Sequence, residues 1–233
     1  MIPLRDENPS RTTPVVTRAL IALNSAFFLY EFLLGPQLEP FIRTWGMVPA
    51  RVSLSLAGRG DPLPVVGFTF LSSMFLHGGW MHLIGNMWFL AIFGDNIEDR
   101  FGHFGYLIFY LASGLVAAGL QYFVAPQSGA PTVGASGAIA GVLGAYAIAY
   151  PGAKVVTLIP LFPFFQVVAL PALVLLGFWF VLQFFSGALS LGAHASGGVA
   201  WWAHVGGFGF GALMMLIFGR SNERASRAWV SED

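Results

Sequence analysis

The sequence predicts an all-α membrane protein that folds as one bundle of six transmembrane helices. The first observation behind this prediction is composition, because 56 % of the 233 residues are hydrophobic and only 9 % are charged. A soluble domain carries about 25 % charged residues, so this chain cannot cover itself with a solvated surface. The second observation is a set of apolar runs, since about 20 such residues span a bilayer. The six runs are Val15–Leu34, Met81–Phe93, Tyr106–Val124, Ser136–Tyr150, Phe165–Ser186 and Val199–Phe218.

The segments before, between and after these runs are short. Residues 1–14 are polar and lack the features of a removable signal peptide in the required order, so we expect a tail followed by a permanent anchor. The membrane domain then covers residues 15–218, and residues 219–233 form a second tail. The largest appendage is the first loop, Gly35–Trp80.

The basic residues predict the orientation in the membrane. With six spans, both termini share one side with the second and fourth loops. Of the eleven basic residues, eight fall on that side and the other three lie in the first loop. Because Lys and Arg are in excess on the cytoplasmic side, we expect both termini in the cytoplasm. The uncharged third and fifth loops, Ala125–Ala135 and Gly187–Gly198, then face outside.

Composition also excludes several classes of function. Cysteine is absent, so neither disulfides nor thiol chemistry contribute. The net charge is zero, which offers no basic surface for nucleic acid. We expect no cofactor and no metal, because the His-Glu-x-x-His string of a metal-dependent protease does not occur.

Polar side chains inside the apolar runs are the candidates for function, since each costs about 2.5–3.5 kcal/mol at the bilayer centre if charged. His82 and Asn86 lie in the second run, Ser136 opens the fourth, and His204 lies in the sixth. At 1.5 Å per residue, Ser136 and His204 both lie roughly 21 Å above the cytoplasmic ends of their helices. His82 and Asn86 share a helix face, because residues four apart stack on one another. Three helices therefore deliver polar groups to one layer of the outer leaflet.

This set of residues is suited to acyl transfer. A serine hydroxyl becomes a good nucleophile only when a base takes its proton, and His204 lies at the depth of Ser136. His82, Asn86 and the backbone N–H of Ser136 could stabilise an oxyanion. Gly134 and Gly137 flank the serine and leave its hydroxyl uncovered. No Asp or Glu occurs between Asp99 and Glu223, so a serine enzyme here would use a Ser–His dyad without an acid.

These residues closely resemble the rhomboid family of intramembrane serine proteases, with one signature in each of the second, fourth and sixth runs. The signatures are His77-x4-His82-x3-Asn86, Gly134-Ala135-Ser136-Gly137, and Ala203-His204-Val205-Gly206-Gly207 followed by Gly211. The resemblance implies a rhomboid-like six-helix fold. It also implies that Ser136 is the nucleophile, His204 the base, and His82 and Asn86 the oxyanion-hole side chains. Some members carry an aromatic ring four residues after the nucleophile, where this chain has Ala140, so Trp201 or Trp202 could orient His204 instead.

Other features leave alternatives open. His77 falls off the face that carries His82, which favours a hydrogen bond that holds a loop over catalysis. The spacings Gly137–Gly141 and Gly207–Gly211 predict close contact between the fourth and sixth helices. The fifth run is either a loosely held helix beside which substrate enters or a plain lipid-facing helix.

The resemblance implies that the partners are membrane lipid and single-span membrane proteins, cut in or near the outer leaflet. The competing classes are a catalytically dead relative that binds membrane helices, which would be expected to lose Ser136 or His204, and an ion transporter, which would show acids in the spans. A bare six-helix unit favours a prokaryotic plasma membrane.

Overall fold

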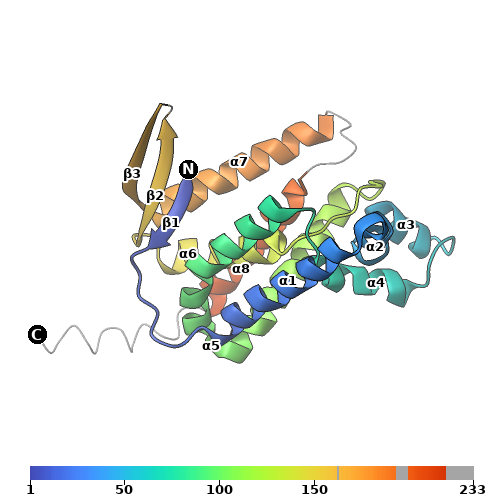
Figure 1. Ribbon diagram of the computed structural model, residues 1–233, viewed down its shortest axis with the longest axis horizontal. Coiled ribbons are helices and arrows are strands. Elements are labelled where there is room, and N and C mark those ends of the chain that lie inside the picture. The colour runs from blue at the N-terminus through green and yellow to red at the C-terminus, as the bar shows by residue number, and fades with distance from the viewer. Residues whose placement is uncertain (162, 193–198, 219–233) are drawn as a thin grey trace, which may run out of the picture.

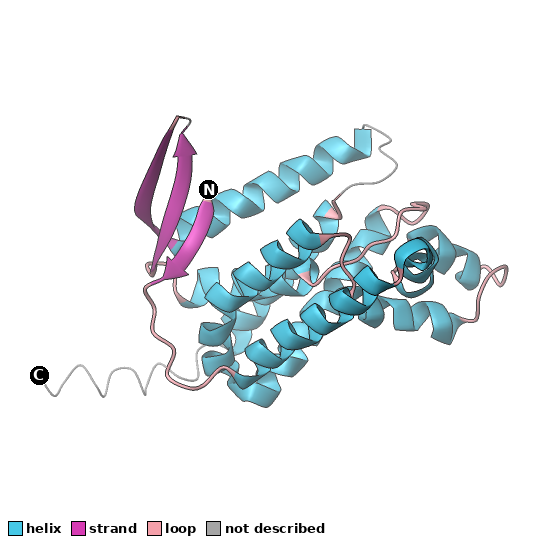
Figure 2. Ribbon diagram, in the orientation of Figure 1, coloured by secondary structure: helices cyan, strands magenta, loops and turns pink. Residues whose placement is uncertain are grey.

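The computed structural model describes residues 1–161, 163–192 and 199–218, and most of them are helical (Figure 1, Figure 2). In this part of the chain four helices are long and apolar enough to cross a membrane. They are α1 (Val15–Leu33), α5 (Trp80–Val124), α7 (Ala172–Gly192) and α8 (Trp201–Phe218), and α6 (Ser136–Ala149) is a shorter apolar helix. The predicted multi-pass helical membrane protein is therefore confirmed. The sequence predicts six spans, whereas four of the described helices are long enough. The two numbers differ because α5 contains two of the predicted runs and α6 has only 14 residues.

The backbone of α5 departs from helical geometry at Gly102, with φ 69° and ψ 161°. The prediction that the second helix ends at Phe93 is wrong, since the helix continues to this glycine. Polar residues in this extension of the helix, such as Glu98, are accommodated because their side chains have hydrogen-bond partners. The Glu98 carboxylate accepts the backbone N–H groups of Val16 and Thr17 at 2.9 and 2.8 Å. It thereby caps the start of α1, where the chain supplies no local side-chain cap.

Three strands form an antiparallel sheet in the order β1-β2-β3, with bounds Ile2–Asp6, Lys154–Leu161 and Phe164–Pro171. Val156 of β2 pairs with Arg5 on one side and with Ala169 on the other. The sheet lies at one end of the helices, beside the start of α7 (Figure 1). Two side chains hold β1 there. The indole N–H of Trp88 donates to the Pro3 carbonyl oxygen at 2.6 Å, and the Tyr146 hydroxyl donates to the Asp6 carboxylate at 2.6 Å.

The sheet corrects the prediction of an all-α chain at residues 2–6, 154–161 and 164–171. Residues 165–171, expected to open the fifth helix, are a strand because Pro160, Pro163 and Pro171 are excluded from a helix interior. The Phe and Val residues between Pro163 and Pro171 suit a strand. The helix begins at Ala172 and continues beyond the predicted Ser186 to Gly192, which shortens the predicted fifth loop. The rest of that loop, residues 193–198, and the tail at 219–233 lie outside the described residues.

The predicted first loop is itself largely helical. A small core of Met47, Val52 and Val66 packs against Ala118 of α5. The side chain of Arg51 donates to the backbone carbonyl oxygen of Thr44 at 2.8 Å. This bond joins the helix that contains Arg51 to the helix that contains Thr44. The helices are α2 (Leu38–Trp45), α3 (Pro49–Leu56) and α4 (Leu63–Ser72), with short 3-10 turns η1 (Gly35–Gln37) and η2 (Ser73–Phe75).

The main core is centred on α6. Every residue from Gly137 to Ala147 is buried, and α5 and α8 enclose the helix. Large side chains of α5, among them Phe93 and Tyr106, fill the space around it. A helix that is apolar all round belongs in the middle of a bundle, so α6 fixes the position of its own first residue, Ser136.

Candidate active site

Glycines let α6 and α8 approach until their backbones touch. Gly207 of α8 faces the carbonyl oxygen of Gly137, and Gly211 faces that of Gly141. A Cβ atom at either position of α8 would overlap the facing oxygen. The predicted helix contact at these spacings is confirmed. It brings the first turns of the two helices together, and these turns carry the candidate nucleophile and base.

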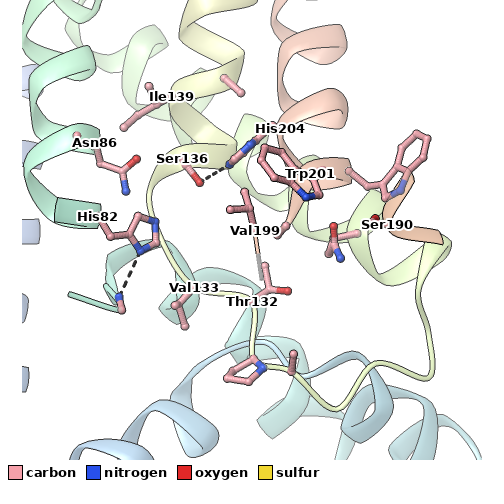
Figure 3. Close-up of a pocket in the computed structure, with 18 of the residues that line it drawn as sticks. His82, Asn86, Thr132, Val133, Ser136, Ile139, Ser190, Val199, Trp201 and His204 are labelled. Atoms are coloured by element: carbon pink, nitrogen blue, oxygen red, sulfur yellow. Dashed lines mark hydrogen bonds between the residues drawn. The ribbon is translucent and has the colours of Figure 1, made fainter. Parts of the chain in front are cut away.

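Ser136 and His204 meet at this contact. The Ser136 hydroxyl lies 2.7 Å from Nε2 of His204, which the dashed line in Figure 3 marks. His204 is only 8 % exposed, so its imidazole is held inside the bundle. Its other ring nitrogen, Nδ1, lies 2.6 Å from the side-chain oxygen of Gln183 on α7. Both ring nitrogens therefore have a hydrogen-bond partner.

Gln183 is the residue that sequence reasoning missed. The available signal was its amide side chain in a largely apolar run, since polar groups inside membrane spans are usually functional. Aromatic rings complete the surroundings of His204, with Trp179 at 5.8 Å between centroids and Trp201 edge-on at 6.4 Å. Of the two tryptophans considered from the sequence, Trp201 makes the ring contact with His204, whereas the ring contact found for Trp202 is with Phe184 on α7.

The turn before Ser136 requires glycine at one position. Gly134 has φ +119°, a conformation that other residues rarely adopt, and a Cβ there would lie 2.6 Å from Nε2 of His82. Its backbone N–H donates to the Ser73 carbonyl oxygen at 2.9 Å. Gly134 therefore lets the chain pass directly against His82 and begin α6 at Ser136.

His82 and Asn86 lie one turn apart on α5 and face the same cavity as Ser136 (Figure 3). Nδ1 of His82 accepts the backbone N–H of Gly78 at 3.3 Å, which leaves Nε2 as the protonated nitrogen. The Asn86 amide nitrogen is buried and has no hydrogen-bond partner within the described residues. An unpaired buried donor is costly, so this one is available to an oxygen of a bound molecule.

His77 supports the site through its backbone. Its N–H donates to the Glu31 carboxylate of α1 at 3.1 Å, and its ring lies edge-on to His82 with centroids 5.2 Å apart. The predicted hydrogen bond at this loop exists, although the backbone makes it instead of the imidazole. Burial lowers the pKa of His77 to about 4, and the neighbouring His82 is a smaller cause. The ring is therefore neutral near pH 7 and packs behind His82.

A cavity of about 780 Å³ connects these groups. The volume is in the range of ligand-binding pockets, and most of the wall is apolar. Among the described residues, no three His, Asp or Glu side chains lie close enough together to hold a metal ion. The wall includes Met81, His82, Asn86 and Phe89 of α5, Ser136, Ile139 and Leu143 of α6, Trp179 of α7, His204 of α8, and residues 130–133.

Comparison with known proteins gives matches over much of the chain. The model of the Rhomboid domain matches residues 66–221. RHOMBOID-like protein 4 of Arabidopsis thaliana is 31 % identical over 180 residues, which are 72 % of this chain and 39 % of that protein. Rhomboid-like protein 11, chloroplastic, of the same plant is 40 % identical over 75 residues, or 32 % of this chain and 26 % of that protein. Presenilin-associated rhomboid-like protein A, mitochondrial, of Danio rerio is 34 % identical over 126 residues, which are 52 % of this chain and 33 % of that protein.

The chain thus spans about a quarter to two fifths of the length of these three relatives. The relatives are plant and animal proteins, two of them with organellar names, and they give no support to the predicted prokaryotic plasma membrane.

Proposed function

The chain belongs to the rhomboid family, whose members are generally intramembrane serine proteases, and we propose that it is itself an active serine endopeptidase. Its substrates are single-span membrane proteins, cut within or near the outer leaflet. The observation that carries the proposal is the 2.7 Å contact between the Ser136 hydroxyl and Nε2 of His204 beside a cavity of about 780 Å³. An inactive relative has no need of this pairing.

The dyad would work by acyl transfer. Nε2 of His204 accepts the hydroxyl proton while Oγ of Ser136 attacks the scissile carbonyl carbon. The imidazolium then gives that proton to the leaving amine, and the acyl group stays on Ser136. Water repeats the sequence with His204 as its base and frees the second product. No carboxylate takes part, because the sequence has no Asp or Glu between residues 99 and 223.

The oxyanion of each tetrahedral intermediate needs donors aimed at it. We assign this role to the Asn86 amide, to Nε2 of His82, and to the backbone N–H of Ser136 at the start of α6. The unpaired amide nitrogen of Asn86 and the Gly78 bond that fixes the His82 tautomer support the assignment. The first N–H groups of a helix have no partner inside it, which suits the third donor.

Six membrane spans with both termini in the cytoplasm fit this scheme. The count is reached when the two parts of α5 on either side of Gly102 are taken as separate spans and α6 is included. The excess of Lys and Arg on the terminal side supports the orientation. Ser136 would then lie in the outer leaflet, and cleavage would release the outer portion of the substrate.

The proposal is tested by cleavage of a model single-span substrate with detergent-purified protein, comparing wild type with Ser136→Ala. We expect cleavage by the wild type that a chelator leaves unchanged, and no cleavage by the variant. Ser113→Ala is the matched control, because this buried serine of α5 bonds to its own helix at the Phe109 carbonyl oxygen. It should cut at the wild-type rate.

A serine-directed fluorophosphonate separates the alternatives. Equal cutting by wild type and Ser136→Ala would contradict the assigned nucleophile. If the wild type neither cuts any substrate tried nor reacts with the probe, the chain is a helix-binding scaffold and the proposal fails.

A further inference from the structure

Resting on the proposed function, we infer that Gln183 is a positioning residue that replaces the acid of a catalytic triad. Its side-chain oxygen lies 2.6 Å from Nδ1 of His204, on the opposite side of the ring from Ser136. The three side chains thus form a continuous chain of hydrogen bonds from α7 through α8 to α6. The geometry is that of a Ser–His–acid triad with a neutral amide in the third place.

The hydrogen bond between Gln183 and His204 is buried, so its loss would leave polar atoms without a partner. Gln183 and His204 are each 8 % exposed, so an unpaired Nδ1–H or amide oxygen in this place would be costly. Trp179, one turn before Gln183 on α7, packs on the same imidazole at 5.8 Å. One face of α7 therefore supplies both the hydrogen bond and the ring contact that hold the base.

An amide oxygen is a sufficient partner for this purpose. It accepts a hydrogen bond from Nδ1–H and so fixes the tautomer in which Nε2 carries a lone pair toward Ser136. A base with the proton on Nε2 could not take the serine proton. The other ionisable groups near the site do not compete for Nδ1, since His82 is bonded to Gly78 and the Glu31 carboxylate accepts the N–H of His77.

The position of Gln183 links the dyad to α7. This helix contacts the rest of the bundle mainly through α8 and more weakly through α6, and much of its surface is exposed. The hydrogen bond to His204 exists only when α7 lies against α8 as it does here. A displacement of α7 would release the imidazole from its productive tautomer.

The test uses three side chains of similar length at one position. Gln183→Met removes the acceptor oxygen and Gln183→Glu keeps it. We expect kcat of Gln183→Met to fall on the order of 10- to 100-fold with KM unchanged, because the oxygen orients the base and does not touch substrate. Gln183→Glu should recover most of kcat. Gln166→Met makes the same replacement at an exposed residue of β3 and should act as wild type.

A cleavage-independent measurement reads the tautomer directly. In protein labelled with 15N-histidine, His204, assigned by its loss in His204→Ala, should carry its proton on Nδ1. Gln183→Met should abolish that preference. This result stands even if no substrate is cut, so failure of the proposed function and failure of the inference are distinguishable.

Two results would overturn the inference. One is an unchanged kcat and tautomer in Gln183→Met. The other is an equal loss of kcat in Gln183→Met and Gln183→Glu, together with an equal fall in thermal stability. That result would make Gln183 a packing residue.

Discussion

The contact of α6 with α8 and the contact of α7 with α8 hold the same histidine in opposite ways. Along the first contact, backbone faces backbone, and glycines such as Gly207 leave no space for a Cβ. Along the second, long side chains meet, as where Phe180 stacks on Phe208 at 4.7 Å. Large apolar side chains of α7, among them Phe178 and Leu182, remain exposed.

This difference indicates a division of labour. The backbone contact cannot shift without overlap, so it fixes the distance from Ser136 to His204. The side-chain contact can adjust, because side chains change rotamer more easily than packed backbones move. It therefore controls the rotation and tautomer of His204 through Gln183. The α6–α8 contact thus sets the distance between nucleophile and base, and the α7–α8 contact sets the tautomer of the base.

Breaking the backbone contact should have the largest effect. Gly207→Val places its side chain against the carbonyl oxygen of Gly137, so α8 must move away from α6. We expect a loss of stability of about 3 kcal/mol or more, as for severe overpacking, and no detectable cleavage. Thermal unfolding in detergent and the cleavage assay measure both.

Gly209→Val is the control on the same helix, because a Cβ at Gly209 meets no other atom within 4 Å. It should keep nearly full stability and activity. An equal loss in both variants would mean that valine damages α8 as a helix, and the backbone contact would lose its assigned role.

The two regions also differ in how far the sequence predicted them. The apolar runs predicted α1, α6 and α8 closely, and Ser136 and His204, which counting residues along the helices placed at one level, are in contact. The sheet was missed because a short apolar run such as residues 165–171 does not distinguish a strand from a buried helix by periodicity. The prolines were the better guide. Gln183 was missed because it carries no charge and its partner lies 21 residues away, on the next helix.

Weakening the side-chain contact should have an intermediate effect. Phe180→Ala removes the ring that stacks on Phe208, and such pairs contribute about 0.5–1.5 kcal/mol beyond area burial. We expect a fall in kcat of about threefold to tenfold with a modest fall in the unfolding temperature. Phe178→Ala deletes a half-exposed ring of the same helix and serves as the control, with wild-type kcat.

A double variant sharpens this prediction. If α7 acts on the dyad through Gln183, Phe180→Ala should lower kcat no further in the Gln183→Met background. Independent, multiplying losses would show that the stacked ring acts on the site by another route.

The smallest effect is expected farthest from the dyad, where the sheet joins the bundle. Trp88→Phe keeps a large apolar ring but removes the indole N–H that donates to the Pro3 carbonyl oxygen at 2.6 Å. A hydrogen bond of this kind contributes about 1 kcal/mol, so a modest fall in unfolding temperature is expected. Trp45→Phe is the control, being similarly exposed on α2. Because neither β1 nor Trp88 contacts His204, kcat should stay at the wild-type value. A fall in kcat in Trp88→Phe alone would mean that the sheet reaches the dyad through α7, which begins directly after β3, and the proposed separation of the two interfaces would have to include the sheet.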